Sequence, residues 1–442
     1  MERWLNMSAT ALGRGIDAGQ IDPVALAQVH LDAIAAHPLA DRVYARTTPD
    51  RTLAEAAAAA TRAKMGQRLS VLDGVPVSWK DLFDTAGTET EAGSALLEGR
   101  TPIADAKVLA TATAMGTVCL GKTHMSELAF SGLGLNPVTA TTPCVNDLDA
   151  VSGGSSSGAA GSIAFKMAPL AIGSDTGGSV RIPAAWNDLV GLKTTSGRLS
   201  LSGVVPLCAR FDTIGPLARN VEDAAAALAV MEGRKPVSMT GQTLEGMRFL
   251  ICDGIAFDDI RREPLDGFNT AVDRLIAQGA HVSRSKMPWT AEALGLSGAL
   301  FTAEAYGTWR DIIEAAPDKM FPEILARFRS GANVSGPEFV AAWQALGCYR
   351  AEFWADAAGY DAILLPTSPI LPPNIERLLT DSDYYVQENL LALRNTRIGN
   401  LMGACAVTLP TGQPSCGISL MAPPMQEDRL LQIAHAAENA LA

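Results

Sequence analysis

The chain has 442 residues, of which 48% are apolar and 19% are charged, with 40 Gly and 25 Pro. This composition is typical of an ordinary globular protein, and at about 150 residues per domain the length allows up to about three domains. The 35 Lys and Arg against 47 Asp and Glu leave a net charge of −12, which argues against binding to nucleic acid or to an anionic membrane surface.

The cysteines and the N-terminal segment indicate the compartment. Seven Cys are scattered along the chain without a C-x-x-C pair, which is typical of free thiols in a reducing environment. The first six residues contain Glu2, Arg3 and Asn6, so they do not form the apolar region of a signal peptide. No stretch reaches 18 apolar residues without Gly, Pro or charge, so we expect a cytoplasmic protein without a transmembrane helix.

The first half of the chain begins with helices and continues with short strands. Asp22 before Pro23 is a typical helix start, and an Ala-rich helix is expected over about residues 52–65. Short apolar runs separated by helical patterns then predict strands at residues 75–77, 117–120, 169–172, 189–192, 249–252, 362–365, 404–409 and 416–421. This alternation predicts an α/β fold with a large central, mixed, mostly parallel sheet that helices cover on both faces.

Two further helix starts divide the second half. Asn220 and Asp223 predict a capping-box-like start for a helix over about 221–231, and Ser335 with Pro337 begins another helix. Between them the chain is mostly helical and contains no recognisable chemistry, so we expect a substrate-shaping region there. The predicted parts are an N-terminal helical segment (1–70), a core with the site (71–232), the substrate-shaping region (233–360) and C-terminal strands with a helix that complete the core (361–442).

Two motif matches are better explained without catalysis. Residues 116–123 fit G-x-x-x-x-G-K-[ST], but a helical pattern precedes them and the residues between the glycines are typical of a buried strand rather than of a phosphate loop. Residues 154–158 fit G-x-S-x-G around Ser156, but polar, turn-like residues precede them instead of a strand. The downstream histidines available as a base, His281 and His435, stand in contexts typical of helices or strand edges. The five histidines have no metal-ligand spacing, so no metal site is expected.

A third pattern is more informative. Two Gly/Ser-rich segments, residues 153–158 and 175–184, flank a predicted helix and strand, and Lys80 stands upstream in the segment 74–81. Flexible linkers do not enclose packed elements in this way. The pattern resembles the amidase signature family of serine hydrolases, and the resemblance covers most of the chain. The other matching segments are residues 121–127, 191–193, 210–216, 222–224, 366–367, 409–410 and 427–428.

The resemblance implies a Ser-Ser-Lys triad. Carried over to the matching positions, Ser179 is the nucleophile, Ser155 is a bridging serine that follows a cis peptide bond, and Lys80 is the base. A serine hydroxyl needs a neighbouring base, and a lysine can serve only if burial keeps it neutral near pH 7 to 8. The backbone amides of Thr176, Gly177, Gly178 and Ser179 are expected to form an oxyanion hole. Supporting roles are expected for Ser156, Asp175 and Arg181, the last two as a buried pair.

The implied function is hydrolysis of a small-molecule carboxamide, or a related C–N bond, through an acyl-enzyme on Ser179, without a metal, nucleotide or organic cofactor. One alternative is the A-type subunit of a glutamyl-tRNA(Gln) amidotransferase, which releases ammonia from glutamine for its partner subunits. The other is a binding module that has lost catalysis, which the intact Lys80, Ser155 and Ser179 disfavour. A homodimer is compatible with the sequence, which does not determine the oligomeric state.

One position bears on the substrate. A malonamidase-like member of the family has an arginine three residues after the nucleophile to hold a substrate carboxylate. Here Ile182 occupies that position and the arginine is Arg181. This difference speaks against a substrate that carries a carboxylate.

Overall fold

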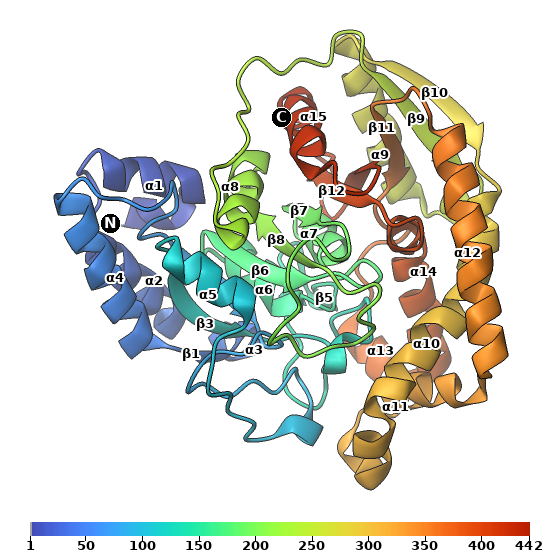
Figure 1. Ribbon diagram of the computed structural model, residues 1–442, viewed down its shortest axis with the longest axis horizontal. Coiled ribbons are helices and arrows are strands. Elements are labelled where there is room, and N and C mark those ends of the chain that lie inside the picture. Colours follow the sequence, from blue (N-terminus) through green and yellow to red (C-terminus); the bar gives the residue numbers. More distant parts are fainter. Residues whose placement is uncertain (1) are drawn as a thin grey trace.

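The computed structural model describes residues 2–442, and within that range the chain forms one 11-stranded sheet and one two-stranded sheet (Figure 1). The order in the large sheet is β1-β3-β2-β6-β8-β7-β12-β13-β11-β9-β10. Its strands are β1 (Tyr44–Thr47), β2 (Pro76–Lys80), β3 (Val118–Thr123), β6 (Leu170–Ser174), β7 (Val190–Lys193), β8 (Ile214–Ala218), β9 (Arg248–Asp253), β10 (His281–Lys286), β11 (Ala362–Pro366), β12 (Cys405–Pro410) and β13 (Gly417–Ala422). The small sheet pairs β4 (Pro143–Cys144) with β5 (Asp147–Val151).

The expected α/β fold with a mixed central sheet is confirmed. Parallel pairing occurs in two blocks, β3-β2-β6 and β11-β9-β10, and the strands between the blocks pair antiparallel. Antiparallel neighbours therefore outnumber parallel ones. The reason is connectivity: β12 and β13 are joined by a short turn, which permits only an antiparallel pair, whereas helices α5 and α9 provide the crossovers for parallel pairs.

Helices cover both faces of the sheet. On one face α6 and α7 contact each other and the central strands, and on the other α8, α15 and α9 contact one another in turn. Figure 1 shows α1, α2 and α4 at one end of the molecule and α10 to α12 at the other. The helices are α1 (Ala9–Asp17), α2 (Pro23–Ala36), α3 (Ala40–Val43), α4 (Pro49–Lys64), α5 (Lys107–Ala114), α6 (Ser157–Ala164), α7 (Arg181–Trp186), α8 (Val221–Glu232), α9 (Arg262–Ala277), α10 (Trp289–Ala315), α11 (Pro322–Arg329), α12 (Gly336–Asp356), α13 (Ile375–Thr380), α14 (Ser382–Leu401) and α15 (Glu427–Leu441).

The helix starts follow the predicted capping residues, with one difference. The side chain of Asp22 accepts a hydrogen bond from the backbone of α2, and Ser335 begins α12 with a complete capping box. Asn220 caps α8 by accepting from the amide of Asp223 at 2.8 Å. The Asp223 carboxylate does not return to Asn220, as a capping box requires, but accepts from two amides at the start of α1. Only one of the two hydrogen bonds of the predicted capping box is therefore formed, because the Asp223 carboxylate binds the start of α1 instead.

Three strands of the large sheet lack the apolar run from which a strand is predicted. β8 contains Gly215 and Pro216, two residues that are rare inside strands, and it pairs antiparallel between β6 and β7. β1 and β10 are edge strands with several polar or exposed residues, so neither has the pattern of a buried strand. The region 233–360 contributes β9 and β10 to the sheet in addition to helices, and the four-part division of the chain remains a prediction. Among the described helices, none is long and apolar enough to cross a bilayer.

Candidate active site

Lys80 lies where two parallel strands end. It is the last residue of β2, and Ser174 is the last residue of the neighbouring strand β6. Since parallel strands bring their carboxyl ends to the same edge of a sheet, side chains from both strands converge there. The Lys80 ammonium donates to Ser174 Oγ at 2.8 Å and to Ser155 Oγ at 2.7 Å. The predicted lysine and bridging serine are therefore in direct contact.

Burial changes the acidity of this lysine. The Lys80 side chain is 0% exposed. Loss of hydration lowers its pKa from 10.5 to about 7, against the smaller opposing effect of the Asp175 and Asp212 carboxylates. Near neutral pH a substantial fraction of Lys80 is thus uncharged and able to accept a proton.

The two Gly/Ser-rich segments are joined through their backbones. The Gly154–Ser155 peptide bond is cis, and the next amide, that of Ser156, donates to the carbonyl of Ser179 at 3.1 Å. The Ser156 hydroxyl is occupied by the backbone of Ser174, to which it donates at 3.2 Å and from which it accepts at 3.3 Å. Ser156 therefore links the first segment to the end of β6, a structural role.

The expected nucleophile, Ser179, lies between β6 and α7 and is 3% exposed. It lines an inner cavity of about 20 Å³ together with Thr176 and Gly177. The amides of Thr176, Gly177 and Ser179 donate to no group among the residues that the structure describes. The amide of Gly178 differs, because it donates to Asp175 Oδ1 at 2.8 Å. Three of the four expected oxyanion-hole amides are thus available for a ligand.

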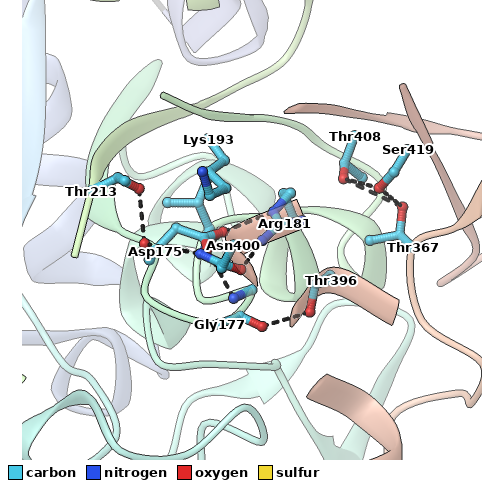
Figure 2. Close-up of polar contacts among 12 residues, drawn as sticks. Asp175, Gly177, Arg181, Lys193, Thr213, Thr367, Thr396, Asn400, Thr408 and Ser419 are labelled. Atoms are coloured by element: carbon cyan, nitrogen blue, oxygen red, sulfur yellow. Dashed lines mark hydrogen bonds and ion pairs between the residues drawn. The ribbon is translucent and has the colours of Figure 1, made fainter. Parts of the chain in front are cut away.

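Gly178 has a different requirement. Its φ of +135° lies in a region that L side chains rarely adopt, and a Cβ at this position would lie 2.0 Å from Thr396 Oγ1. The Thr396 hydroxyl itself donates to the carbonyl of Gly177 at 2.8 Å (Figure 2). The glycine therefore permits close contact between α14 and the loop between β6 and α7, which carries the expected nucleophile Ser179 and is called the nucleophile loop below.

Asp175 and Arg181 form the expected buried pair (Figure 2). Arg181 donates to the two carboxylate oxygens of Asp175 at 3.0 Å each and to Asn400 Oδ1 at 2.6 Å. Burial raises the pKa of Asp175, but the Arg181 guanidinium and the other donors outweigh it and lower this pKa to about 2. The ionised pair and Asn400 hold the loop between β6 and α7 from both sides.

Several residues of the site were not predicted from the sequence. Ser174 contacts Lys80, and Asp212 accepts from the Thr176 hydroxyl at 2.5 Å. Thr396 and Asn400 come from α14, where buried polar residues recur at helical spacing from Asn389 onward. That periodicity on a long helix is a detectable signal for a polar, inward-facing side.

Two arginines of the inner cavity correct an expectation. Arg327 lies on α11 and Arg397 on α14, and both line the cavity with Ser179. Arg327 belongs to the region 233–360, in which the sequence showed no recognisable chemistry. Isolated arginines on amphipathic helices are usually solvated, so only the packing of α11 against the site reveals this one.

The other motif matches have structural explanations. Residues 118–123 form β3, and the Lys122 ammonium is buried, donates to Thr90 Oγ1 at 2.9 Å and lies 3.3 Å from Asp81 Oδ1. This strand geometry differs from a phosphate loop, as expected. His281 begins the edge strand β10 and is exposed, and His435 lies on α15, 3.7 Å from Glu438.

Comparison with known proteins agrees with this geometry. The family model "Amidase" matches residues 26–431. A 2-amino-5-chloromuconic acid deaminase from Comamonas testosteroni is 36% identical over 408 residues, which cover 89% of this chain and 87% of that protein. The A-type subunit of the glutamyl-tRNA(Gln) amidotransferase from Anaeromyxobacter sp. (strain K) is 32% identical, and the match covers 97% of this chain and 95% of that protein.

A solved structure described as an amidase superposes with a TM-score of 0.87 at 26% identity, covering 99% of this chain and all of its own. The family match, the two relatives and the superposition each span most of the chain, including both Gly/Ser-rich segments and the strand of Lys80. The chain therefore belongs to the amidase family of hydrolases.

Proposed function

We propose that this amidase hydrolyses a small-molecule carboxamide, or a related C–N bond, through an acyl-enzyme on Ser179. The observation that carries the proposal is the contact between Lys80 and Ser155. A buried lysine with a pKa of about 7 lies 2.7 Å from a serine whose segment is joined to that of Ser179.

The reaction begins with neutral Lys80. Ser155 gives its proton to Lys80 and takes the proton of Ser179, whose oxygen then attacks the amide carbonyl carbon. The same relay, run in reverse, returns a proton to the nitrogen as the C–N bond breaks, so that ammonia or an amine leaves. Water then attacks the acyl-enzyme, with the relay as its base, and releases the carboxylate.

The oxyanion of the tetrahedral intermediate would be held by the amides of Thr176, Gly177 and Ser179. We omit the amide of Gly178 from the oxyanion hole because it already donates to Asp175. Amides fixed in place before the reaction stabilise the developing charge without reorganisation. Asp175, Arg181 and Ser156 would act by fixing the two segments that carry the reacting serines.

A panel of amides with ammonia detection tests the activity. We expect release of ammonia from at least one class and covalent labelling of Ser179 by a fluorophosphonate, located by mass spectrometry. An adduct on Ser156 would contradict the assignment of the nucleophile. Because one relative is named as a deaminase of an amino-substituted muconic acid, amino-substituted unsaturated acids belong in the panel.

The alternative is an A-type amidotransferase subunit, which the coverage of 97% of this chain by one such protein keeps open. It predicts ammonia release from glutamine and stable association with partner subunits. Affinity purification from the source cells, followed by a glutaminase assay of the purified material, distinguishes the two. Turnover of a small amide by the isolated chain supports the amidase.

A further inference from the structure

Two arginines next to the nucleophile lack an acidic partner. In the part of the chain that the structure describes, no carboxylate oxygen lies within 4.0 Å of Arg327 or Arg397, whereas Arg181 has both oxygens of Asp175 at 3.0 Å. The Arg327 side chain is half-buried, but its Nη1 is enclosed and has no hydrogen-bond partner. Arg397 is 9% exposed, and its hydrogen bond is a long one of 3.4 Å to Ser297 Oγ. Burying charges in this way is costly unless a ligand compensates it.

The surroundings of the two guanidiniums make the charge imbalance clear. Burial lowers the pKa of Arg327 to about 10, and burial together with the repulsion from Arg327 lowers that of Arg397 to about 9. Arg327 stacks over Phe130 at 4.4 Å and Arg397 lies 5.8 Å from the Phe301 ring centre. These aromatic contacts fix the positions of the arginines without neutralising them.

The arginines stand where two cavities meet. The inner cavity at Ser179 and an outer cavity of about 540 Å³ share Phe301, Arg327 and Arg397 as lining residues. The inner cavity is lined by no Asp or Glu among the described residues, and Glu323 lines the outer one without contacting either arginine. Two further buried polar atoms without a partner line the outer cavity, a donor in the Tyr385 hydroxyl and one acceptor in Glu323 Oε2. The junction thus offers hydrogen-bond donors in excess of acceptors.

Arg397 lies close to the loop that carries Ser179. A Cβ placed on Gly177, two residues before Ser179, would lie 3.9 Å from Arg397 Nε. A group held by Arg397 is therefore a few bonds from the carbonyl that Ser179 attacks. The planar guanidinium fork matches a carboxylate in shape and charge.

We propose that Arg327 and Arg397 bind a carboxylate on the acyl side of the substrate, so that the enzyme acts on monoamides of short dicarboxylic acids. This inference rests on the proposed function. It reverses the expectation drawn from Ile182, because the arginines that hold the carboxylate come from α11 and α14 rather than from the nucleophile loop.

Matched substrate pairs test the proposal. Malonamate, succinamate and glutaramate are each compared with the corresponding diamide, which differs only in an uncharged amide in place of the carboxylate. We expect kcat/KM to favour at least one monoamide by about 100-fold, the factor that charge-assisted hydrogen bonds typically give. Equal or better turnover of every diamide would overturn the proposal.

Variants locate the effect. In Arg327→Met and Arg397→Met the preference for the monoamide should fall to within about threefold of unity, mainly through KM. Arg329→Met is the matched control, because Arg329 lies on the same helix but is exposed and paired with Glu314 at 2.7 Å. Circular dichroism and thermal melting, applied also to Arg327→Lys and Arg397→Lys, separate loss of substrate recognition from loss of fold. Preference retained in both Met variants would contradict the assignment.

A binding measurement is independent of turnover. Calorimetry on Ser179→Ala should detect succinate, and adding Arg397→Met should weaken this binding by about 30-fold or more. Inorganic phosphate binding as tightly as succinate, or succinate binding that is unchanged by Arg397→Met, would overturn the carboxylate site.

If Ser179 is not labelled by fluorophosphonate and no amide is hydrolysed, the proposed function itself fails. If labelling and hydrolysis occur without preference for acids, only this inference fails.

Discussion

The arginine that follows the loop of Ser179 and the two arginines that line the inner cavity have opposite surroundings. Arg181, on the side of the nucleophile loop, gives two hydrogen bonds to Asp175 and one to Asn400, and only its Nη1 is unpartnered. Arg327 and Arg397, on the side of α11 and α14, have no acidic partner among the described residues. A buried charge with a partner stabilises the loop beside it. A charge without a partner, next to the proposed nucleophile, favours the binding of a ligand of opposite charge.

In the proposed mechanism the reacting groups lie on the paired side, so the largest effect should follow from removing the hydroxyl of Ser179. Ser179→Ala should lower kcat by about 10⁴-fold or more, because the side chain is small and the loss is chemical. The melting temperature should change little.

Ser155→Ala should also lower kcat by several orders of magnitude for amides and by less for esters, since an alkoxide leaves without a returned proton. Equal losses for esters and amides would assign Ser155 a structural role only.

Stability should separate the two kinds of arginine. Arg181→Met leaves the Asp175 carboxylate buried without its cation and should cost about 3 to 5 kcal/mol of unfolding free energy. Arg397→Met removes a desolvated cation that a neighbouring arginine repels, so it should leave stability unchanged or raise it. Chemical denaturation of both variants measures the difference. A large loss of stability in Arg397→Met would show that an intramolecular partner compensates Arg397 after all.

Lys80 is a buried cation on the paired side, and its effect depends on pH. The folded protein releases this proton with a pKa of about 7 and the unfolded chain near 10.5, so stability rises with pH between these values. Below pH 7 the cost of burying the charge is fully present. Lys80→Met should therefore stabilise the protein by up to about 3 to 5 kcal/mol at pH 6, and the gain should vanish near pH 10.5. A gain that does not vary with pH would contradict the lowered pKa.

The same ionisation should govern activity. Protonated Lys80 cannot accept a proton, so kcat/KM should rise with pH along one ionisation near pH 7 and then reach a plateau. Because a histidine would titrate in a similar range, variants are needed for the assignment. Lys80→Ala should flatten the acidic limb, whereas His281→Ala and His435→Ala should retain it. Loss of the limb in either histidine variant would contradict the role of Lys80.

The smallest effect concerns the contact that joins the two sides. Thr396→Val removes the hydrogen bond to the Gly177 carbonyl and should cost about 1 kcal/mol of stability, with a several-fold fall in kcat. Thr408→Val is the control, because Thr408 belongs to a separate buried hydroxyl cluster with Thr367 and Ser419 (Figure 2). It should lose similar stability and keep its activity. Equal kinetic effects in both variants would show that the Gly177 contact is not specific.

Local features of this chain are well determined by its sequence. The apolar runs of β2 and β6, the capping residues Asp22 and Ser335 and the spacing of the Gly/Ser-rich segments act through neighbouring residues. They therefore predict strands, helix starts and loops without knowledge of the rest of the molecule. The resemblance added candidate roles for Lys80, which the structure places against Ser155.

Other features depend on long-range packing. The antiparallel insertion of β8 between β6 and β7 and the use of Asp223 by α1 follow from which elements meet in space. The proposed role of Arg397 follows from its surroundings. It lines the inner cavity together with Arg327, and no carboxylate of the described residues lines that cavity. No stretch of sequence encodes the absence of a partner, because that partner could come from any element of the fold. Only the tertiary structure decides whether a buried charge is satisfied.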